Sequence, residues 1–333
     1  DLLNAEVAVS ADFRGPAPVV LQMVNGSPLA ELTARALTRT VVSGNAEYKL
    51  KLLLQVADLA KSSVQGSISM SGNDLQISPD TPKLTRTRGV LNFTQRGFTL
   101  AGVQTRMLGG DARLEGGLLL SGSDNTHPSA IRAAGLATAE GLRQATELGL
   151  VARLARQLSG SAAYNASFGL RRGVPELLVT SNLQGMGASL PSPLTKNAQS
   201  LLPLRYQTAS PVAPLSARRT PAPVQDRLTL TLGSLVSLTY ERDVSGTEPR
   251  VLRGAIGIGA DTLDTVMLPE QGINANIHLP QFNVDAWADL LAQVTAAPLG
   301  TPDAGKHPEL AYLPSNLAAV SYTHLRAHET VLD

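Results

Sequence analysis

The stretch YKLKLLLQV, residues 48–56, alternates apolar and polar side chains with a period of two. Its apolar positions are Leu50, Leu52, Leu54 and Val56, and its polar positions include Lys49, Lys51 and Gln55. Successive side chains of a β-strand point to opposite faces of the sheet. The pattern therefore predicts a strand with one apolar and one polar face.

The same alternation returns in four further runs. Their apolar phases are Val64, Ile68 and Met70; Leu228, Leu230 and Leu232; Leu252, Ile256 and Ile258; and Ile273, Ile277 and Leu279. Glycine-containing turn signals separate strand-like runs at 71–74, 95–97, 108–111 and 171–173. Because short turns join antiparallel neighbours, the sequence predicts a mainly β fold with an antiparallel, mostly meander-like sheet.

Two segments have helical periodicity instead, and they predict one or two short helices. Residues 139–158 place an apolar stripe at helical spacing, made of Leu142, Leu148, Val151, Leu154 and Leu158. The second helix is expected at 285–296, with Asp285 as its N-cap and with a stripe made of Trp287, Leu290, Leu291 and Val294. Residues 203–226 are Pro-rich and predict an irregular or extended connection.

The composition limits the possible functions. The 333 residues are enough to bury a sizeable core, but only 17% are charged, compared with about 25% in ordinary globular domains. The formal net charge of +1 gives no electrostatic argument for binding nucleic acid. The absence of cysteine excludes disulfides and thiolate chemistry. We interpret the start at Asp1, inside a strand-like run, as a sign that the chain is a piece of a longer protein.

The C-terminal tail contains a histidine pair that resembles a metal-binding motif. His324 and His328 lie four residues apart, with Glu329 adjacent. However, residues 320–330 resemble one reading frame of the mosaic-end adapter used in transposase-based DNA library preparation. We therefore interpret residues 320–333 as a non-native tail, with native sequence ending near Ala319.

No other pattern predicts catalysis. His127, His278 and His307 each lack a second ligand at metal-binding spacing, so surface histidine is the better interpretation. The glycines of 253–261 lie inside an alternating run and are interpreted as strand glycines. Carboxylate pairs such as Asp261 and Asp264, or Glu6 and Asp12, are interpreted as solvated turn residues, although glycosidases also use two carboxylates. The sequence thus predicts no catalytic residue, no metal and no cofactor.

The segment 176–205 carries a longer motif, in which a strand ending in Ser-Asn-Leu-x-Gly leads into Leu-Pro-x-Pro-Leu-x-Lys. The motif residues are Ser181, Asn182, Leu183, Gly185, Leu190, Pro191, Pro193, Leu194 and Lys196. This pattern resembles that of the YhdP family, within the AsmA-like superfamily. Residues 89–117 and 131–143 are similar to family segments too, and Asp285 and Trp287 match a family helix start. The resemblance covers roughly residues 1–300 in consistent order.

The resemblance implies a section of a long bridge-like lipid transfer protein in the periplasm. The parent protein would be anchored in the inner membrane and would reach toward the outer membrane. An elongated, curled sheet would hold phospholipid acyl chains in an apolar groove. The strand alternation assigns these groove residues by polarity alone: Leu50, Leu52, Leu54, Val56, Val64, Ile68, Met70, Leu228, Leu230, Leu232, Ile256 and Ile258.

Two alternatives stay open. The residues alone favour a closed β-sandwich, so the chain would then be a structural or adhesive envelope module. A carbohydrate-active enzyme would need two carboxylates facing each other across a cleft. The motif is assigned a structural role, since Gly185 and Gly187 let the chain leave its strand while Pro191 and Pro193 hold an extended, non-pairing segment.

The expected organisation follows from these segments. It comprises a repetitive antiparallel β section (1–128), a strand with an amphipathic helix (129–160), a β section with the motif (161–202), a Pro-rich connection (203–226), a β section ending in a short helix (227–300), a loop (301–319) and the non-native tail (320–333).

Overall fold

The computed structural model describes most of the chain. The described residues are 6–27, 37–55, 62–119, 130–171, 174–210, 224–246, 249–259, 267–279, 283–295, 312 and 316–321. Contacts divide the chain into two compact units. Unit 1 comprises residues 1–186 and 198–201, and unit 2 comprises residues 187–197 and 202–333. Within the described residues, no helix is long and apolar enough to span a membrane.

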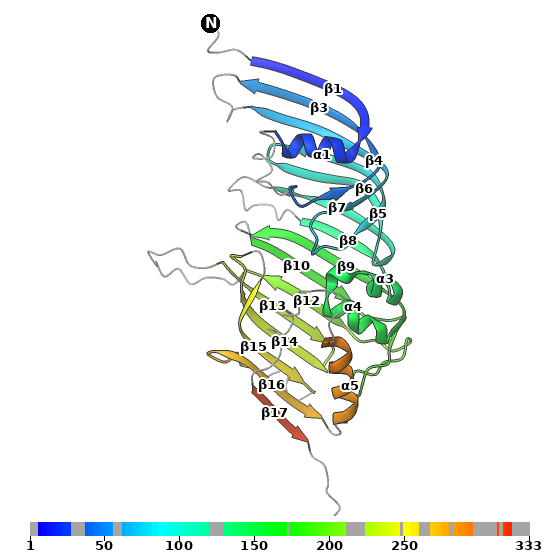
Figure 1. The fold of residues 1–333 in the computed structure, drawn as a ribbon, viewed down its shortest axis with the longest axis vertical. Coiled ribbons are helices and arrows are strands. Elements are labelled where there is room, and N and C mark those ends of the chain that lie inside the picture. Colours follow the sequence, from blue (N-terminus) through cyan, green and yellow to red (C-terminus); the bar gives the residue numbers. More distant parts are fainter. Residues whose placement is uncertain are drawn as a thin grey trace, which may run out of the picture. The chain divides into compact units, whose positions relative to one another are not determined.

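Unit 1 is built on one open, curled sheet whose strands, apart from the two-residue β2, lie side by side in chain order (Figure 1). Its strands are β1 (Glu6–Pro16), β2 (Val41–Val42), β3 (Asn45–Gln55), β4 (Ser63–Gln76), β5 (Leu84–Thr94), β6 (Gly97–Met107), β7 (Gly109–Leu119), β8 (Ala130–Thr138), β9 (Leu158–Arg171) and β10 (Val174–Ser181). β1 pairs with β3, β2 pairs with β4, and β3 to β10 pair in sequence, all antiparallel. The helix α1 (Ala17–Asn25) follows β1. The prediction of a mainly β fold with a curled sheet is confirmed.

The curl of this sheet coincides with breaks in the strand register. Register shifts lie between Ser71 and Asn73, between Arg88 and Val90, between Leu100 and Val103, and between Gly109 and Ala112. These shifts fall on consecutive strand pairs from β4–β5 to β7–β8. Because a β-bulge bends its strand and increases the local twist, these successive shifts contribute to the curl of the sheet.

The predicted helix at 139–158 is broken into four short pieces. They are α3 (Ala139–Gln144), η3 (Thr146–Leu148), α4 (Leu150–Leu154) and η4 (Ala155–Gln157). Gly149 adopts φ 54° and ψ −113°, which ends the helical path between η3 and α4. The prediction of one continuous helix was therefore wrong.

The apolar stripe predicted for this helix was also wrong in part. Val151 is 48% exposed, whereas Ala139, Ala152 and Ala155 are buried. A Cβ atom on Gly141 would lie 2.1 Å from the backbone carbon of Leu108. Small residues therefore face the sheet because the backbones approach closely, and the larger aliphatic Val151 turns outward.

The main strands of unit 2 are β12 (Leu204–Ala209), β13 (Gln225–Leu232), β14 (Val236–Asp243), β15 (Arg250–Ile258), β16 (Gly272–Leu279) and β17 (Asn316–Ser321). Strands β12 to β15 pair antiparallel, but β15–β16 and β16–β17 are parallel. The all-antiparallel prediction was therefore wrong here. The connections 259–271 and 280–315 are longer than hairpin turns, and parallel pairing requires such crossovers.

Two further details of unit 2 differ from the sequence predictions. Strand β12 lies inside the stretch 203–226 that was expected to be an irregular or extended connection, of which residues 211–223 lie outside the described part. The helix α5 (Val284–Thr295) is capped by Asn283, whose Oδ1 accepts a hydrogen bond from the Ala286 amide at 3.0 Å. Asp285 lies in the first turn and is not the N-cap. There its carboxylate complements the positive end of the helix dipole.

Candidate functional site

The register of unit 1 brings the predicted groove residues of β3 and β4 onto one side of the sheet. Directly paired residues point to the same face, and Leu52 pairs with Val64 while Leu50 pairs with Gly66. Ile68 and Met70 follow Val64 with a period of two on β4. The side chain of Leu54 and all of Val56 lie outside the described part of the chain. We call the side that carries Leu50 the apolar face of unit 1.

The apolar face continues across strands that the sequence analysis did not include. Cross-strand pairs extend it from Ile68 to Leu91 and then to Leu100, and farther along from Ile131 to Phe168 and then to Leu177. A signal was present in LNFTQRGFTL, residues 91–100, because a turn at QRG pairs Phe93 with Phe98 and extends the alternation outward.

Burial differs between the two sides of this sheet. The buried hydrophobic residues on the apolar face are Ala46, Tyr48, Val64, Val103, Ala112, Leu118, Ala137, Ala162 and Tyr164, and the buried polar residues Asn73, Thr87 and Thr105 lie on the same side. On the opposite face, Lys49, Lys51, Gln65, Arg88 and Gln104 are exposed. The predicted groove residues Leu50, Leu52, Ile68 and Met70 are half-buried, so their aliphatic side chains are still accessible.

Two aromatic side chains on the apolar face lie flat against a glycine on the neighbouring strand. A Cβ atom on Gly66 would lie 2.6 Å from Cζ of Phe93, which is its directly opposite partner. A Cβ atom on Gly135 would lie 2.8 Å from the hydroxyl of its partner Tyr164. A ring standing upright from the sheet would not come so close to the neighbouring backbone. Burial raises the pKa of Tyr164 to about 12, which keeps its hydroxyl neutral.

In unit 2 the predicted groove residues lie on β13 and β15, and the intervening strand β14 places them on the same side of the sheet. Leu230 pairs with Leu238, which pairs with Ile256. One step along the strands, Leu232 pairs with Val236, which pairs with Ile258. We call this side the apolar face of unit 2. Four predicted residues on it, Leu230, Leu232, Ile256 and Ile258, are half-buried and lie together.

Leu228 has a different environment. It forms a buried cluster with Tyr240 and Ile273. The partly buried side chains that pack against this cluster are Tyr206, Leu238, Val251, Ile256 and Tyr312. A leucine enclosed in this way stabilises the fold through buried area, and it offers little surface to a ligand. Leu228 is thus a buried core residue, whereas the predicted groove residue Ile256 packs against the same cluster and stays half-buried.

A buried ion pair lies beside this cluster. Arg242 Nε donates to Asp226 Oδ1 at 2.8 Å, and Arg242 Nη2 donates to Asp226 Oδ2. Arg242 Nη1 also donates to the Tyr312 hydroxyl at 3.2 Å. Burial alone would lower the pKa of Arg242, but the hydrogen bonds from its guanidinium to Asp226 and Tyr312 outweigh that effect and raise it. The sequence analysis did not single out either charged residue.

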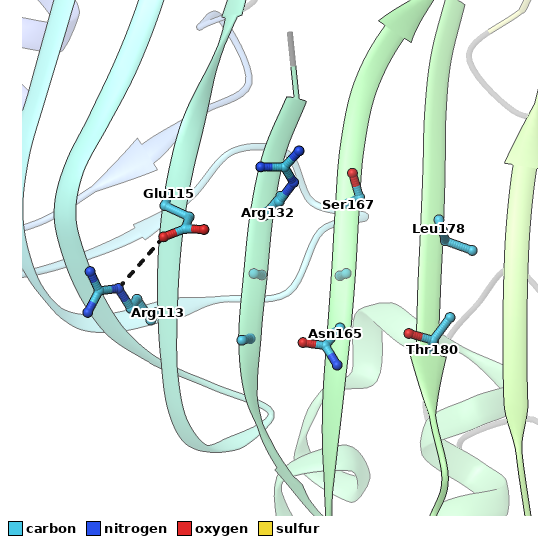
Figure 2. A pocket seen from close by; sticks show the side chains of 10 residues that line it. Arg113, Glu115, Arg132, Asn165, Ser167, Leu178 and Thr180 are labelled. Carbon is cyan, nitrogen blue, oxygen red and sulfur yellow. Dashed lines mark ion pairs between the residues drawn. The ribbon is translucent and has the colours of Figure 1, made fainter. Parts of the chain in front are cut away.

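We call the side opposite the apolar face, which carries Lys51 and Gln65, the polar face of unit 1. This face has a hollow of about 280 Å³ over β7 to β10 (Figure 2). Its labelled side chains are Arg113, Glu115, Arg132, Asn165, Ser167, Leu178 and Thr180. Glu115 is the single carboxylate in this lining, and its Oε2 lies 3.9 Å from Arg113 Nε. Glycosidase chemistry needs two facing carboxylates, so this hollow does not supply it. The hollow contains none of the predicted groove residues.

Metal ligation has no support in the described part of the chain. No group of three or more His, Asp or Glu side chains that could hold a metal ion occurs among the described residues. The tail histidines His324 and His328 lie outside them.

The first half of the sequence motif forms a tight turn after β10. Ser181 Oγ donates to the Ala163 carbonyl at 2.6 Å and accepts from the Leu183 amide at 3.0 Å. Gly185 has φ 92°, and a Cβ atom there would lie 2.3 Å from the Ser161 carbonyl oxygen. Glycine is required at this position because both the backbone conformation and the close approach exclude a side chain.

The second half of the motif packs against α5 within unit 2. Trp287 Nε1 donates to the Ser192 carbonyl at 3.1 Å. Lys196 is buried, and its backbone forms an isolated antiparallel β-bridge with Ala188. Burial lowers the pKa of the Lys196 amine. Two sequence features that lie 95 residues apart therefore meet in space.

Comparison with known families gives one match. The family described as "YhdP protein" matches residues 1–329, which include most of the predicted non-native tail. Neither the curated proteins nor the solved structures contain a match to the chain. Because the family match covers nearly all 333 residues, the resemblance predicted from the motif is confirmed, and with it a link to AsmA-like lipid transport in the bacterial envelope. The chain belongs to the YhdP family.

Proposed function

We propose that this chain is a section of a conduit that carries phospholipid between the inner and outer membranes, with acyl chains held against the apolar face of each unit. The observation that carries the proposal is the cross-strand register. It places Leu50, Leu52 and Ile68 on one continuous apolar face in unit 1, and Leu230 and Ile256 on another in unit 2. No catalytic residue takes part.

The size of the hydrophobic effect explains why such a face is useful. Each CH₂ group removed from water gains ~0.8 kcal/mol, so exposing an acyl chain of about sixteen carbons costs on the order of 12 kcal/mol. A continuous aliphatic surface removes most of this barrier without any chemical step. The half-buried leucines and isoleucines of both faces are suited to the task, because they contact any acyl chain without selecting for a polar group.

The burial pattern supports the apolar face of unit 1 as the concave side. Side chains on the inside of a curled sheet crowd together and lose exposure, whereas those on the outside spread apart. Ala46, Val103 and Ala162 on the apolar face are each at most 3% exposed, and Lys51 and Gln65 on the other face are exposed. In this proposal phospholipid is the partner of the apolar faces. The parent protein is anchored in the inner membrane and crosses the periplasm, and nucleic acid has no role.

A structural envelope module is the second candidate, and one observation favours it. The buried cluster of Leu228, Tyr240 and Ile273 is a closed core in unit 2. If the rest of the apolar face were covered in the same way, the chain would carry no lipid.

Mass spectrometry of co-purifying lipids tests the proposal. The chain is expressed in the periplasm in two forms. One has the unaltered sequence, and the other carries Leu52→Glu plus Leu230→Glu on the apolar faces. The matched control carries Gln65→Glu and Thr229→Glu, which the register places on the opposite faces. We expect phospholipid to co-purify with the unaltered chain and with the control, and to be lost from the folded Leu52→Glu plus Leu230→Glu variant. A folded, unaltered chain without lipid would support the closed module instead.

A further inference from the structure

The apolar face of unit 2 changes character along its strands. The register defines rows that run across β13, β14 and β15. The outermost row contains Asp226, Arg242 and Val251. The next row contains Leu228 and Tyr240, which belong to the buried cluster. The last two rows contain only aliphatic side chains, namely Leu230, Leu238 and Ile256, then Leu232, Val236 and Ile258.

The outermost row is closed to hydrocarbon by its charges. The side chains of Asp226 and Arg242 are 7% and 10% exposed, and two hydrogen bonds join them. An acyl chain entering between them would separate two buried charges and leave both without compensation. Because hydrocarbon cannot solvate either group, this position excludes it.

Tyr312 covers the second row. The Tyr240 hydroxyl donates to the Tyr312 carbonyl at 2.9 Å, and the two rings meet edge to face with centroids 5.1 Å apart. The Tyr312 hydroxyl in turn accepts the hydrogen bond from Arg242. One residue therefore links the ion pair to the cover of Leu228.

We propose that Asp226, Arg242 and Tyr312 form a side wall, which confines acyl chains in unit 2 to the two aliphatic rows of Leu230 and Leu232. This inference rests on the proposed lipid transport and names the residues that set the width of the path. The wall acts by excluding hydrocarbon from the charged end of the strands.

The absence of cysteine allows a direct test in the whole chain. Leu232→Cys places a thiol in the aliphatic rows, and Val251→Cys places one in the wall row. Each variant is treated with hexadecyl methanethiosulfonate and, separately, with the small methyl reagent. Mass spectrometry gives the rate of modification. The ratio of the long-chain rate to the short-chain rate corrects for the accessibility of each thiol.

We expect this ratio to be at least about tenfold higher for Leu232→Cys than for Val251→Cys, because the buried charges exclude the alkyl chain. Replacing the pair by Asp226→Leu plus Arg242→Met should raise the ratio at Val251→Cys toward that at Leu232→Cys. Such apolar replacements of buried pairs commonly preserve the fold. The matched control, Arg227→Met plus Glu241→Leu, acts on the opposite face of the same strands. It removes the ion pairs of Glu241 with Arg227 and with Arg253 and should leave the ratio at Val251→Cys unchanged.

The outcomes separate the wall from the proposed function. Equal ratios well above one at the two cysteines, in the otherwise unaltered chain, would overturn the wall, even if the double replacement failed to fold. A ratio near one at both positions would mean that neither thiol meets long alkyl chains, and this result would contradict lipid binding itself.

Discussion

The apolar faces of units 1 and 2 arise from the same alternation but end differently. In unit 1 the face runs from β1 to β10, and a series of register shifts bends its strands. In unit 2 one side of the face is closed by a buried ion pair and a tyrosine. The difference teaches that alternation determines which side of a sheet is apolar, while the residues at the strand ends determine what can reach it.

The largest expected effect contrasts the ion pairs of the two units. Asp226→Ala leaves Arg242 buried without its partner, which should lower the free energy of unfolding by about 3–5 kcal/mol. Arg113→Ala breaks an exposed pair with Glu115 and should cost less than about 1 kcal/mol. Urea unfolding measures both. Equal losses would contradict the contrast between a structural wall and a solvated face.

The next effect compares two neighbouring leucines on β13. Leu228→Ala should lower the free energy of unfolding by about 2–5 kcal/mol, because it opens a cavity in the buried cluster. Leu230→Ala should cost less than half as much, since its side chain is only partly buried. Urea unfolding measures both variants. If Leu230→Ala lowered the free energy of unfolding as much as Leu228→Ala, the aliphatic rows would not be open.

The buried hydroxyls of Tyr240 in unit 2 and Tyr164 in unit 1 differ in their hydrogen bonding. The Tyr240 hydroxyl bonds to Tyr312, so Tyr240→Phe should cost about 1 kcal/mol. The Tyr164 hydroxyl is buried without a hydrogen-bond partner among the described residues, so Tyr164→Phe should be neutral or stabilising. Thermal unfolding at pH 7 checks both. A clear loss of stability in Tyr164→Phe would show that this hydroxyl has a partner.

The same tyrosines give a pH dependence with a defined sign. Burial raises the pKa of Tyr164 and of Tyr240 to about 12, from the ordinary tyrosine value of 10.0. The unfolded state therefore loses these protons first, so their contribution to stability is complete below pH 10 and is lost as the pH rises toward 12. Each Phe variant should have a shallower loss of stability between pH 10 and 12 than the parent. An unchanged slope would contradict the burial of these hydroxyls.

The smallest effect concerns the start of α5. Asn283→Ala removes the capping hydrogen bond and should cost about 1 kcal/mol. Asp285→Asn removes a charge that only complements the helix dipole and should cost about 0.3–1 kcal/mol. Thermal unfolding of the two variants compares them. A greater loss in Asp285→Asn would restore the cap predicted from the sequence.

The strands and their apolar phases were predictable, because a period of two is a local property. YKLKLLLQV alternates whether or not its neighbours are known, and β3 has the predicted faces. The parallel strands β16 and β17 were not predictable in this way, since alternation does not encode the direction of a neighbouring strand. The broken helix at 139–158 depends on Gly149 and on close backbone packing, which an apolar stripe does not reveal.

The side wall could have been found from the sequence. Leu232 and Val236 flank the turn between β13 and β14, and counting outward from that turn pairs Asp226 with Arg242. Both charges fall on the apolar phase of their strands, where an unpaired charge would be costly. The sequence analysis searched for catalytic carboxylates and did not ask which opposite charges a hairpin would bring together.

The central claim is that hydrocarbon contacts the apolar face and not the more exposed polar face. Leu52 and Lys51 are adjacent on β3 and point to opposite sides, so Leu52→Cys and Lys51→Cys offer the most direct measurement. The methyl methanethiosulfonate should modify the exposed Lys51→Cys faster, while the hexadecyl reagent should prefer Leu52→Cys. If both reagents follow exposure and favour Lys51→Cys, the apolar face does not bind acyl chains and the account is contradicted.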